Sequence, residues 1–174
     1  MPKLFSFRGK RKKPSPPYGR AALRILIAAA FLVLMLLNLF TFVFSVVRYN
    51  GTGMEPTLQH HQLLLLRKTD DVKQGDIIAF YYNNKLLVRR VICTGGGLVG
   101  MDEHGNISVN GQPLDEPYLS GPSVGQTGVN FPHNVSVDHF FVMGDNRATA
   151  MDSRLNEIGD ISRDRVLGKV ILIF

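Results

Sequence analysis

The side chains best suited to covalent chemistry are a hydroxyl and two imidazoles near position 55. Thr52 carries a hydroxyl that could act as a nucleophile, and His60 and His61 follow closely enough in the sequence to be candidate bases. Two adjacent residues in a strand point to opposite faces of the sheet, so at most one of these histidines could face Thr52. Each of the five histidines is more simply a surface or loop residue. A pairing of Thr52 with a histidine is therefore an alternative and not the leading hypothesis.

Sulfur and metal chemistry have little support in this sequence. Cys93 is the single cysteine, which rules out an internal disulfide and any multi-cysteine zinc or iron–sulfur site. It lies in an apolar run, where we expect a small core residue. No histidine pair shows ligand spacing next to a carboxylate ligand. We therefore expect no metal site and no cofactor.

Short apolar runs separated by turn signals must position any functional groups after residue 48. The runs lie at 63–66, 77–82, 86–93, 139–143 and 166–174. They alternate with turn signals, and no stretch of this region has a helical period over ten or more residues. The pattern predicts an all-β domain of antiparallel sheets, folded as a barrel or sandwich.

Two of the turn signals have the composition of tight hairpins. Asn83-Asn84 separates two apolar runs and predicts a β-hairpin. Asn110-Gly111 predicts a second tight turn, because asparagine and glycine tolerate the left-handed backbone that such turns need.

A membrane anchor precedes this domain. Residues 25–47 contain no charge. As a helix they would be roughly 34 Å long, which exceeds the hydrocarbon core of about 30 Å. The run is longer than the apolar core of a secretory signal peptide, and no small-x-small cleavage site follows it. We predict an uncleaved transmembrane helix at 25–47.

Charge around the predicted helix sets its orientation. Eight of the 20 Lys and Arg residues lie in the first 24 positions, and the first acidic residue is Glu55. The positive-inside rule predicts a basic cytoplasmic tail at 1–24 and an extracytoplasmic domain at 48–174 of a single-pass cell-membrane protein. The rest of the chain carries 12 basic and 14 acidic residues, which argues against nucleic-acid binding. Membrane lipid is an expected partner.

Several segments together resemble a known family. They are GTGMEPTL at 51–58, GDIIAF at 75–80, LLVRRVI at 86–92, VNGQPLDEPYL at 109–119 and FVMGDNRATAMDSR at 141–154. In this order and spacing they resemble the type I bacterial signal peptidases (S26-like), membrane-anchored serine proteases that cut signal peptides from exported preproteins. The resemblance covers nearly all of residues 49–174 and the topology, and it is greatest to the compact Gram-positive-type members. It implies a signal-peptidase-like β domain.

The resemblance also implies a catalytic mechanism whose groups this chain lacks. The family uses a serine nucleophile, a buried neutral lysine as base and a second serine that orients the lysine. The matching positions here are Gly53, Arg89 and Ala150. Glycine has no nucleophile, arginine stays protonated and cannot accept a proton, and alanine cannot orient a base. We therefore expect no intact catalytic site.

Other residues of the family pattern are retained, and the resemblance gives them two roles. The peptide cleft would be walled by Gly51, Thr52, Met54 and Pro56. Structural support, through turn geometry and carboxylate–guanidinium pairing, would come from Asp145, Asn146, Arg147, Asp152 and Arg154. In the family the cleft binds an extended peptide as an added strand. A buried arginine at position 89 would need a carboxylate or carbonyl partner, or would have to point outward.

Three functional hypotheses follow. The leading one is an inactive, anchored signal peptidase homologue that binds an exported preprotein or subunit as an accessory factor. In its lost residues the chain is similar to the signal-peptidase-like proteins of pilus assembly, which implies a pilin-like subunit or sortase machinery as partner. The second hypothesis is an active signal peptidase with a non-standard pair such as Thr52 and His60. The third is a structural membrane partner whose cleft binds nothing, so enzyme activity stays an open question.

Overall fold

One long apolar helix precedes a β-rich body. The computed structural model describes residues 17–119, 121 and 123–174. By its residue contacts the chain divides into two units, and the division along the sequence falls between Phe40 and Thr41. Helix α1, Pro17–Val43, contains a stretch from Tyr18 to Val43 with a mean hydropathy of 2.6. By length and composition this helix can cross a membrane, and its apolar side chains are exposed all round, as in lipid.

The helix differs at both ends from the predicted span of 25–47. It begins at Pro17, because proline at the first helical position loses no hydrogen bond. It ends at Val43, four residues early, because residues Phe44–Arg48 form strand β1. The valines of β1 are as apolar as the helix, so hydropathy does not mark this boundary. Of the predicted tail at 1–24, residues 1–16 lie outside the described residues and the rest is helical.

The body contains two antiparallel sheets, as the sequence predicts. The larger has seven strands in the order β1–β2–β11–β3–β4–β9–β10. Beyond β1 these are β2 Leu63–Arg67, β11 Val166–Ile173, β3 Ile77–Tyr82, β4 Lys85–Thr94, β9 His139–Met143 and β10 Ile161–Ser162. The smaller sheet has the order β7–β6–β5–β8, comprising Gln112–Pro113, Ile107–Val109, Leu98–Met101 and His133–Asn134. A short 3-10 helix, η1 Arg163–Arg165, precedes β11. Each of the five predicted runs is a strand in the larger sheet.

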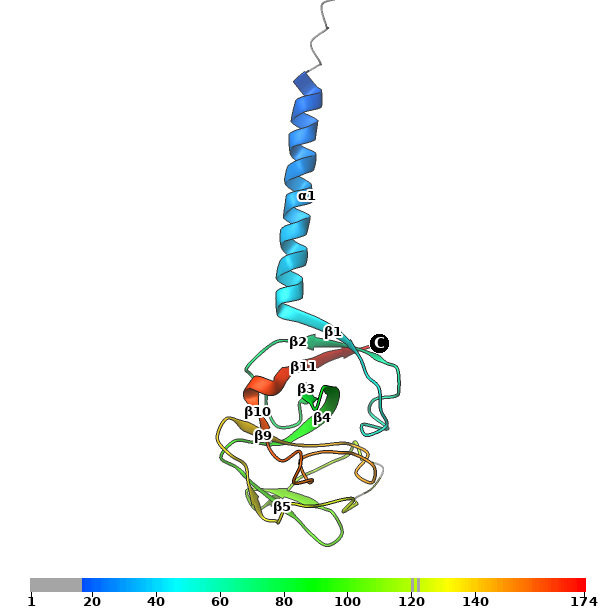
Figure 1. Ribbon diagram of the computed structural model, residues 1–174, viewed down its shortest axis with the longest axis vertical. Helices are drawn as coiled ribbons and strands as arrows, with labels where there is room; N and C mark the ends of the chain where they lie inside the picture. Colours follow the sequence, from blue (N-terminus) through cyan, green and yellow to red (C-terminus); the bar gives the residue numbers. More distant parts are fainter. Residues whose placement is uncertain (1–16, 120, 122) are drawn as a thin grey trace, which may run out of the picture. The chain divides into compact units, whose positions relative to one another are not determined.

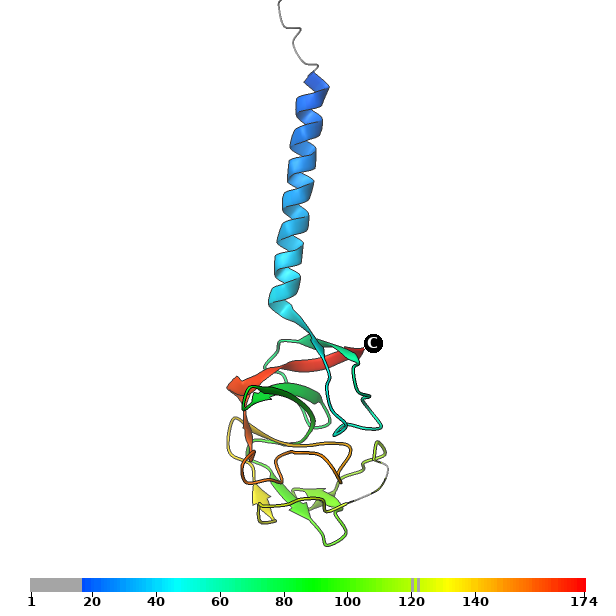
Figure 2. The ribbon, with the colours of Figure 1, turned by 45° about the vertical axis from the view of Figure 1, so that its right-hand side comes forward.

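Figures 1 and 2 show how these strands are layered within the body. The larger sheet curls from β1, β2 and β11 at one end through β3 and β4 to β9, and β5 of the smaller sheet lies beyond β9. Both predicted hairpin turns are confirmed. Asn83 and Asn84 have φ values of 46° and 59°, and Asn110 and Gly111 have 52° and 79°. Each pair joins two directly paired strands, as in a type I′ turn.

Strand β3 is buried on both faces and separates two parts of the core. Ile78 and Phe80 pack on one side, with side chains from β4 and β9. Ala79 packs on the other side, in a cluster that includes Met54 and Leu58. Met54 and Leu58 lie in the loop between β1 and β2, so the core fixes that loop against the sheet.

Substitution of neighbouring residues in β3 tests this burial pattern. Phe80→Ala removes a side chain with 0% exposure and is expected to lower the free energy of unfolding by about 3–5 kcal/mol. Tyr81→Ala is the matched control, because Tyr81 is 54% exposed, and its cost is expected to be below about 1 kcal/mol. Denaturant unfolding of the full chain in detergent measures both. Equal losses for the two variants would contradict the arrangement.

Candidate functional site

The loop between β1 and β2 is held in place by its own buried side chains. Met54 and Leu58 are fully buried, and Leu58 N donates to Met54 O at 2.9 Å. The Tyr49 hydroxyl accepts a hydrogen bond from Met54 N at 3.0 Å. Burial raises the pKa of Tyr49, which keeps this hydroxyl neutral. Buried side chains and these hydrogen bonds therefore hold the segment that contains Gly53 in place.

A buried ion pair organises the segment at 144–154. Arg154 donates from Nε and Nη2 to the two carboxylate oxygens of Asp152, at 2.9 Å each. Both side chains are completely buried, and Asp152 also accepts from Gly144 N at 2.9 Å. Two further guanidinium hydrogens of Arg154 are donated to the carbonyls of Val124 and Arg147. The resemblance implies carboxylate–guanidinium pairing in this segment without naming the partners, and here Asp152 pairs with Arg154.

Asp145 connects this segment to β4 and to the Gly53 loop. It accepts two hydrogen bonds from Arg90, at 2.9 Å from Nε and 2.6 Å from Nη2. The hydroxyl of Thr57 donates to the same carboxylate at 2.5 Å. Sequence reasoning missed Arg90 and Thr57 as partners. The doublet Arg89-Arg90 was the available signal, because adjacent strand residues face opposite sides of the sheet.

A second buried pair extends the network to the region near 116–118. Arg147 forms an ion pair with Glu116, and the hydroxyl of Tyr118 donates to the same Glu116 oxygen at 2.7 Å. Burial and the neighbouring Glu116 carboxylate raise the pKa of Tyr118 well above its ordinary value. The Tyr118 ring lies under Arg90, with 3.9 Å from the guanidinium carbon to the ring centroid. Glu116 and Tyr118 were also missed by sequence reasoning.

The three positions that the resemblance assigns to catalysis lie together. A Cβ atom built on Gly53 would be 3.2 Å from Nη2 of Arg89 and 3.4 Å from Cα of Ala150. Asn146 N donates to Gly53 O at 3.1 Å, and the Asn146 amide donates to Thr52 O at 3.3 Å. A Cβ on Gly144 would lie 2.3 Å from Gly53 O, so only glycine allows the two segments to come this close.

The side chain of Arg89 lies next to Gly53. Its side chain is 5% exposed, and it donates from Nε to Met151 O at 2.8 Å and from Nη1 to Val88 O at 2.6 Å. A buried arginine here was expected to have a carboxylate partner, a carbonyl partner or an outward side chain. Its partners are carbonyls. Burial lowers the pKa of Arg89, and the Asp152 carboxylate partly offsets this effect. The group remains a cation, because an arginine side chain stays protonated in proteins.

The alternative pair of Thr52 with a histidine has no geometric support. Thr52 is exposed, and His60 and His61 lie in a turn and not in a strand as assumed above. Their rings are 3.8 Å apart, centroid to centroid, because the turn places them side by side. Nδ1 of His60 accepts from Gly51 N at 2.9 Å. No hydrogen bond joins Thr52 to either imidazole in the described part of the chain.

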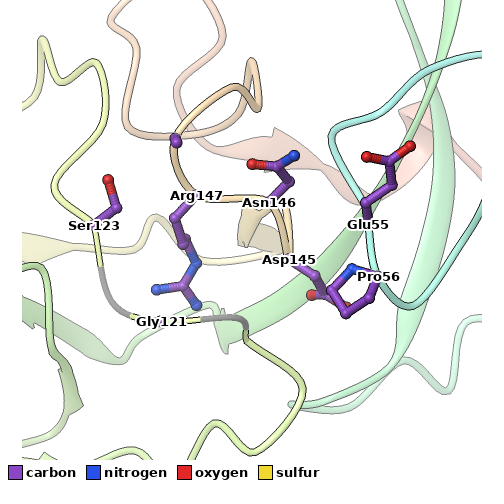
Figure 3. Close-up of a pocket in the computed structure, with 8 residues that line it drawn as sticks. Glu55, Pro56, Gly121, Ser123, Asp145, Asn146 and Arg147 are labelled. Carbon is purple, nitrogen blue, oxygen red and sulfur yellow. The ribbon is translucent and has the colours of Figure 1, made fainter.

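A cavity of about 540 Å³ lies beside this site. Figure 3 shows Glu55 and Pro56 on one side, Ser123 and Gly121 on the other, and Asp145, Asn146 and Arg147 between them, with Arg147 directed toward Gly121. The lining therefore carries both signs of charge. Among the described residues, no group of three His, Cys, Asp or Glu side chains is arranged to hold a metal ion.

Comparisons with known proteins give the family of this chain. Residues 22–174 match the family model described as signal peptidase, peptidase S26. Signal peptidase I P of Bacillus subtilis subsp. natto is 33% identical over 95% of this chain and 91% of that protein. Signal peptidase I T of Bacillus subtilis (strain 168) is 34% identical over 94% of this chain and 88% of that protein.

A solved structure is also similar. The crystal structure of a signal peptidase I from Enterococcus faecalis V583 has a TM-score of 0.48 and 27% identity, and the match covers 59% of this chain and 97% of that one. The family model spans most of the sequence, and the two Bacillus proteins match almost end to end. The chain belongs to the peptidase S26 family of signal peptidases.

Proposed function

We propose that this membrane-anchored, signal-peptidase-like chain has no peptidase activity and binds an exported peptide or protein subunit. One observation carries the proposal: Gly53, Arg89 and Ala150 lie next to one another. These are the positions where the family resemblance calls for nucleophile, base and orienting serine. None of the three side chains can perform its role.

The missing chemistry is specific. Attack on a peptide carbonyl needs a nucleophile and a neighbouring group that accepts the nucleophile's proton. At Gly53 there is no side-chain atom beyond Cα, and the guanidinium beside it is already protonated. Loss of a main member of a catalytic unit typically lowers kcat by about 10⁶. A loss of this size is enough by itself to abolish measurable turnover.

Peptide binding does not need those groups. The proposed wall of Gly51, Thr52, Met54 and Pro56 lies in a loop that is held by a hydrogen bond to Tyr49 and by the core. Pro56 lines the cavity beside the site, whereas Met54 is fully buried and supports the loop from the core side. Recognition of an extended peptide by strand addition uses backbone groups and apolar pockets, neither of which depends on a nucleophile. A preformed wall also reduces the entropy lost on binding.

Topology supports an exported partner. Eight basic residues in the first 24 positions place the N-terminus in the cytoplasm by the positive-inside rule, and the β body then lies outside the cell membrane. We assign the body a role as an accessory factor in surface-protein assembly, with a pilin-like subunit or sortase-linked machinery as the partner class. Contact with membrane lipid follows from helix α1.

A direct assay separates binding from turnover. The full chain in lipid nanodiscs is expected to bind a fluorescent preprotein peptide without cutting it, with a cleavage rate at least about 10⁶ below that of an active signal peptidase. Signal peptidase I T of Bacillus subtilis serves as the positive control, and mass spectrometry detects cleavage. Turnover that disappears in Thr52→Ala or His60→Ala would instead establish a non-standard catalytic pair. Absence of both turnover and binding would favour a purely structural role.

Stepwise restoration of the missing groups tests the assignment of positions. Gly53→Ser alone is expected to remain inactive, because the new hydroxyl would face a guanidinium that cannot accept its proton. The combination Gly53→Ser, Arg89→Lys and Ala150→Ser supplies nucleophile, base and orienting hydroxyl, and detectable cleavage is expected. The same mass-spectrometric assay measures both. Cleavage by the single variant would show that another base already lies in place.

A further inference from the structure

Arg89 has an unused hydrogen-bond donor at the cleft floor. Its Nε and Nη1 are bound to carbonyls, whereas Nη2, the atom that faces Gly53, has no partner among the described residues. In that part of the chain, Arg147 Nη1 is the one fully buried side-chain nitrogen or oxygen that lacks a partner. Arg89 Nη2 therefore retains some exposed area.

The charge of Arg89 has no direct ion-pair partner among the described residues and is offset only in part, without contact, by the Asp152 carboxylate. Arg90, Arg147 and Arg154 each form an ion pair with a carboxylate, whereas no ion pair is found for Arg89 in the described part of the chain. Both oxygens of Asp152 are bound by Arg154, and both oxygens of Asp145 are bound by Arg90. No local carboxylate is thus free to pair with Arg89. A guanidinium with this little exposure is costly unless an anion compensates it.

We propose that Arg89 makes this cleft a receptor for the free α-carboxylate of a peptide, the group that remains at the C-terminus of a cleaved signal peptide. The proposal rests on the peptide-binding function proposed above and names the ligand class. A guanidinium donates to carboxylate oxygens with strong, charge-assisted hydrogen bonds. Because Gly53 has no side chain, the space next to Nη2 that a Cβ at position 53 would occupy, 3.2 Å from this nitrogen, holds no side-chain atom of that residue.

An uncut preprotein would satisfy this donor less well. It presents a neutral carbonyl at the same place, which can accept from the guanidinium but brings no negative charge and therefore no ion-pair attraction. A peptide that ends at the floor brings a full negative charge next to a cation without a counter-ion. The site therefore selects the product of signal-peptide cleavage over its precursor, and this chain would bind what active relatives release.

Matched peptides test the proposal on the unmodified protein. Two fluorescent peptides of about ten residues share one sequence that ends in alanine, and one carries a C-terminal acid and the other a C-terminal amide. Fluorescence anisotropy against the full chain in nanodiscs of neutral lipid measures both Kd values. The acid is expected to bind about tenfold or more tightly than the amide, because its carboxylate adds an attraction between opposite charges that the neutral amide lacks.

Variants locate the preference on one side chain. Arg89→Gln should reduce the acid-to-amide ratio to about one, because glutamine carries no charge. Arg165→Gln is the matched control, since it removes the same charge from an exposed position in η1, and the ratio should stay unchanged. Circular dichroism checks the folding of each variant. If Arg89→Gln does not fold, Arg89→Lys replaces it, and loss of the planar donor fork should lower the ratio.

The possible outcomes distinguish this inference from the proposed function. Equal Kd values for acid and amide on the unmodified protein would overturn the carboxylate proposal and leave peptide binding intact. No binding of either peptide would overturn both. Displacement of the acid peptide by sodium acetate at an equal concentration would also overturn it, because the site would then hold any small anion. A preference for the acid that depends on Arg89 and resists acetate would support the proposal.

Discussion

The positions of the segments around Gly53 depend on buried pairs of guanidinium and carboxylate groups. Asp152 with Arg154, Asp145 with Arg90, and Glu116 with Arg147 join strand β4, the 116–118 region and the 144–154 segment into one unit. Removal of one partner from such a pair leaves an uncompensated buried charge and typically costs about 3–5 kcal/mol. Asp145 also binds Thr57, so the same network sets the position of the Gly53 loop.

This network is independent of the groups that a peptidase would use. None of its ion pairs involves the side chain at position 53, 89 or 150. Changes of the side chains at these three positions therefore remove no member of these ion pairs. The close approach of Gly144 to Gly53 is likewise a matter of backbone packing and not of chemistry. A signal-peptidase-like fold and a non-catalytic cleft are physically compatible for this reason.

The sequence predicted the parts of this structure that are local and missed those that depend on long-range pairing. Strand runs and both hairpin turns follow from hydrophobic period and turn chemistry, whereas carboxylate–guanidinium pairing in the 144–154 segment is what the family resemblance implies. Arg90 and Asp145 are 55 residues apart, and Thr57 and Asp145 are 88 apart, so only the register of the sheet brings them together. The end of helix α1 was also missed, because the apolar character continues into β1.

Arginine at position 89 has an energetic cost that an apolar residue would not have. Replacement of buried charges by well-packed apolar side chains often leaves folding stability unchanged or raises it. Stability of the fold alone therefore does not require a cation at position 89. The carbonyls of Met151 and Val88 satisfy two of its donors, yet neither neutralises its charge. A ligand that brings a carboxylate to Nη2 would supply this compensation only while it is bound. Its binding free energy would then include relief of a cost that the empty protein carries, and a neutral ligand of the same shape would not gain this contribution.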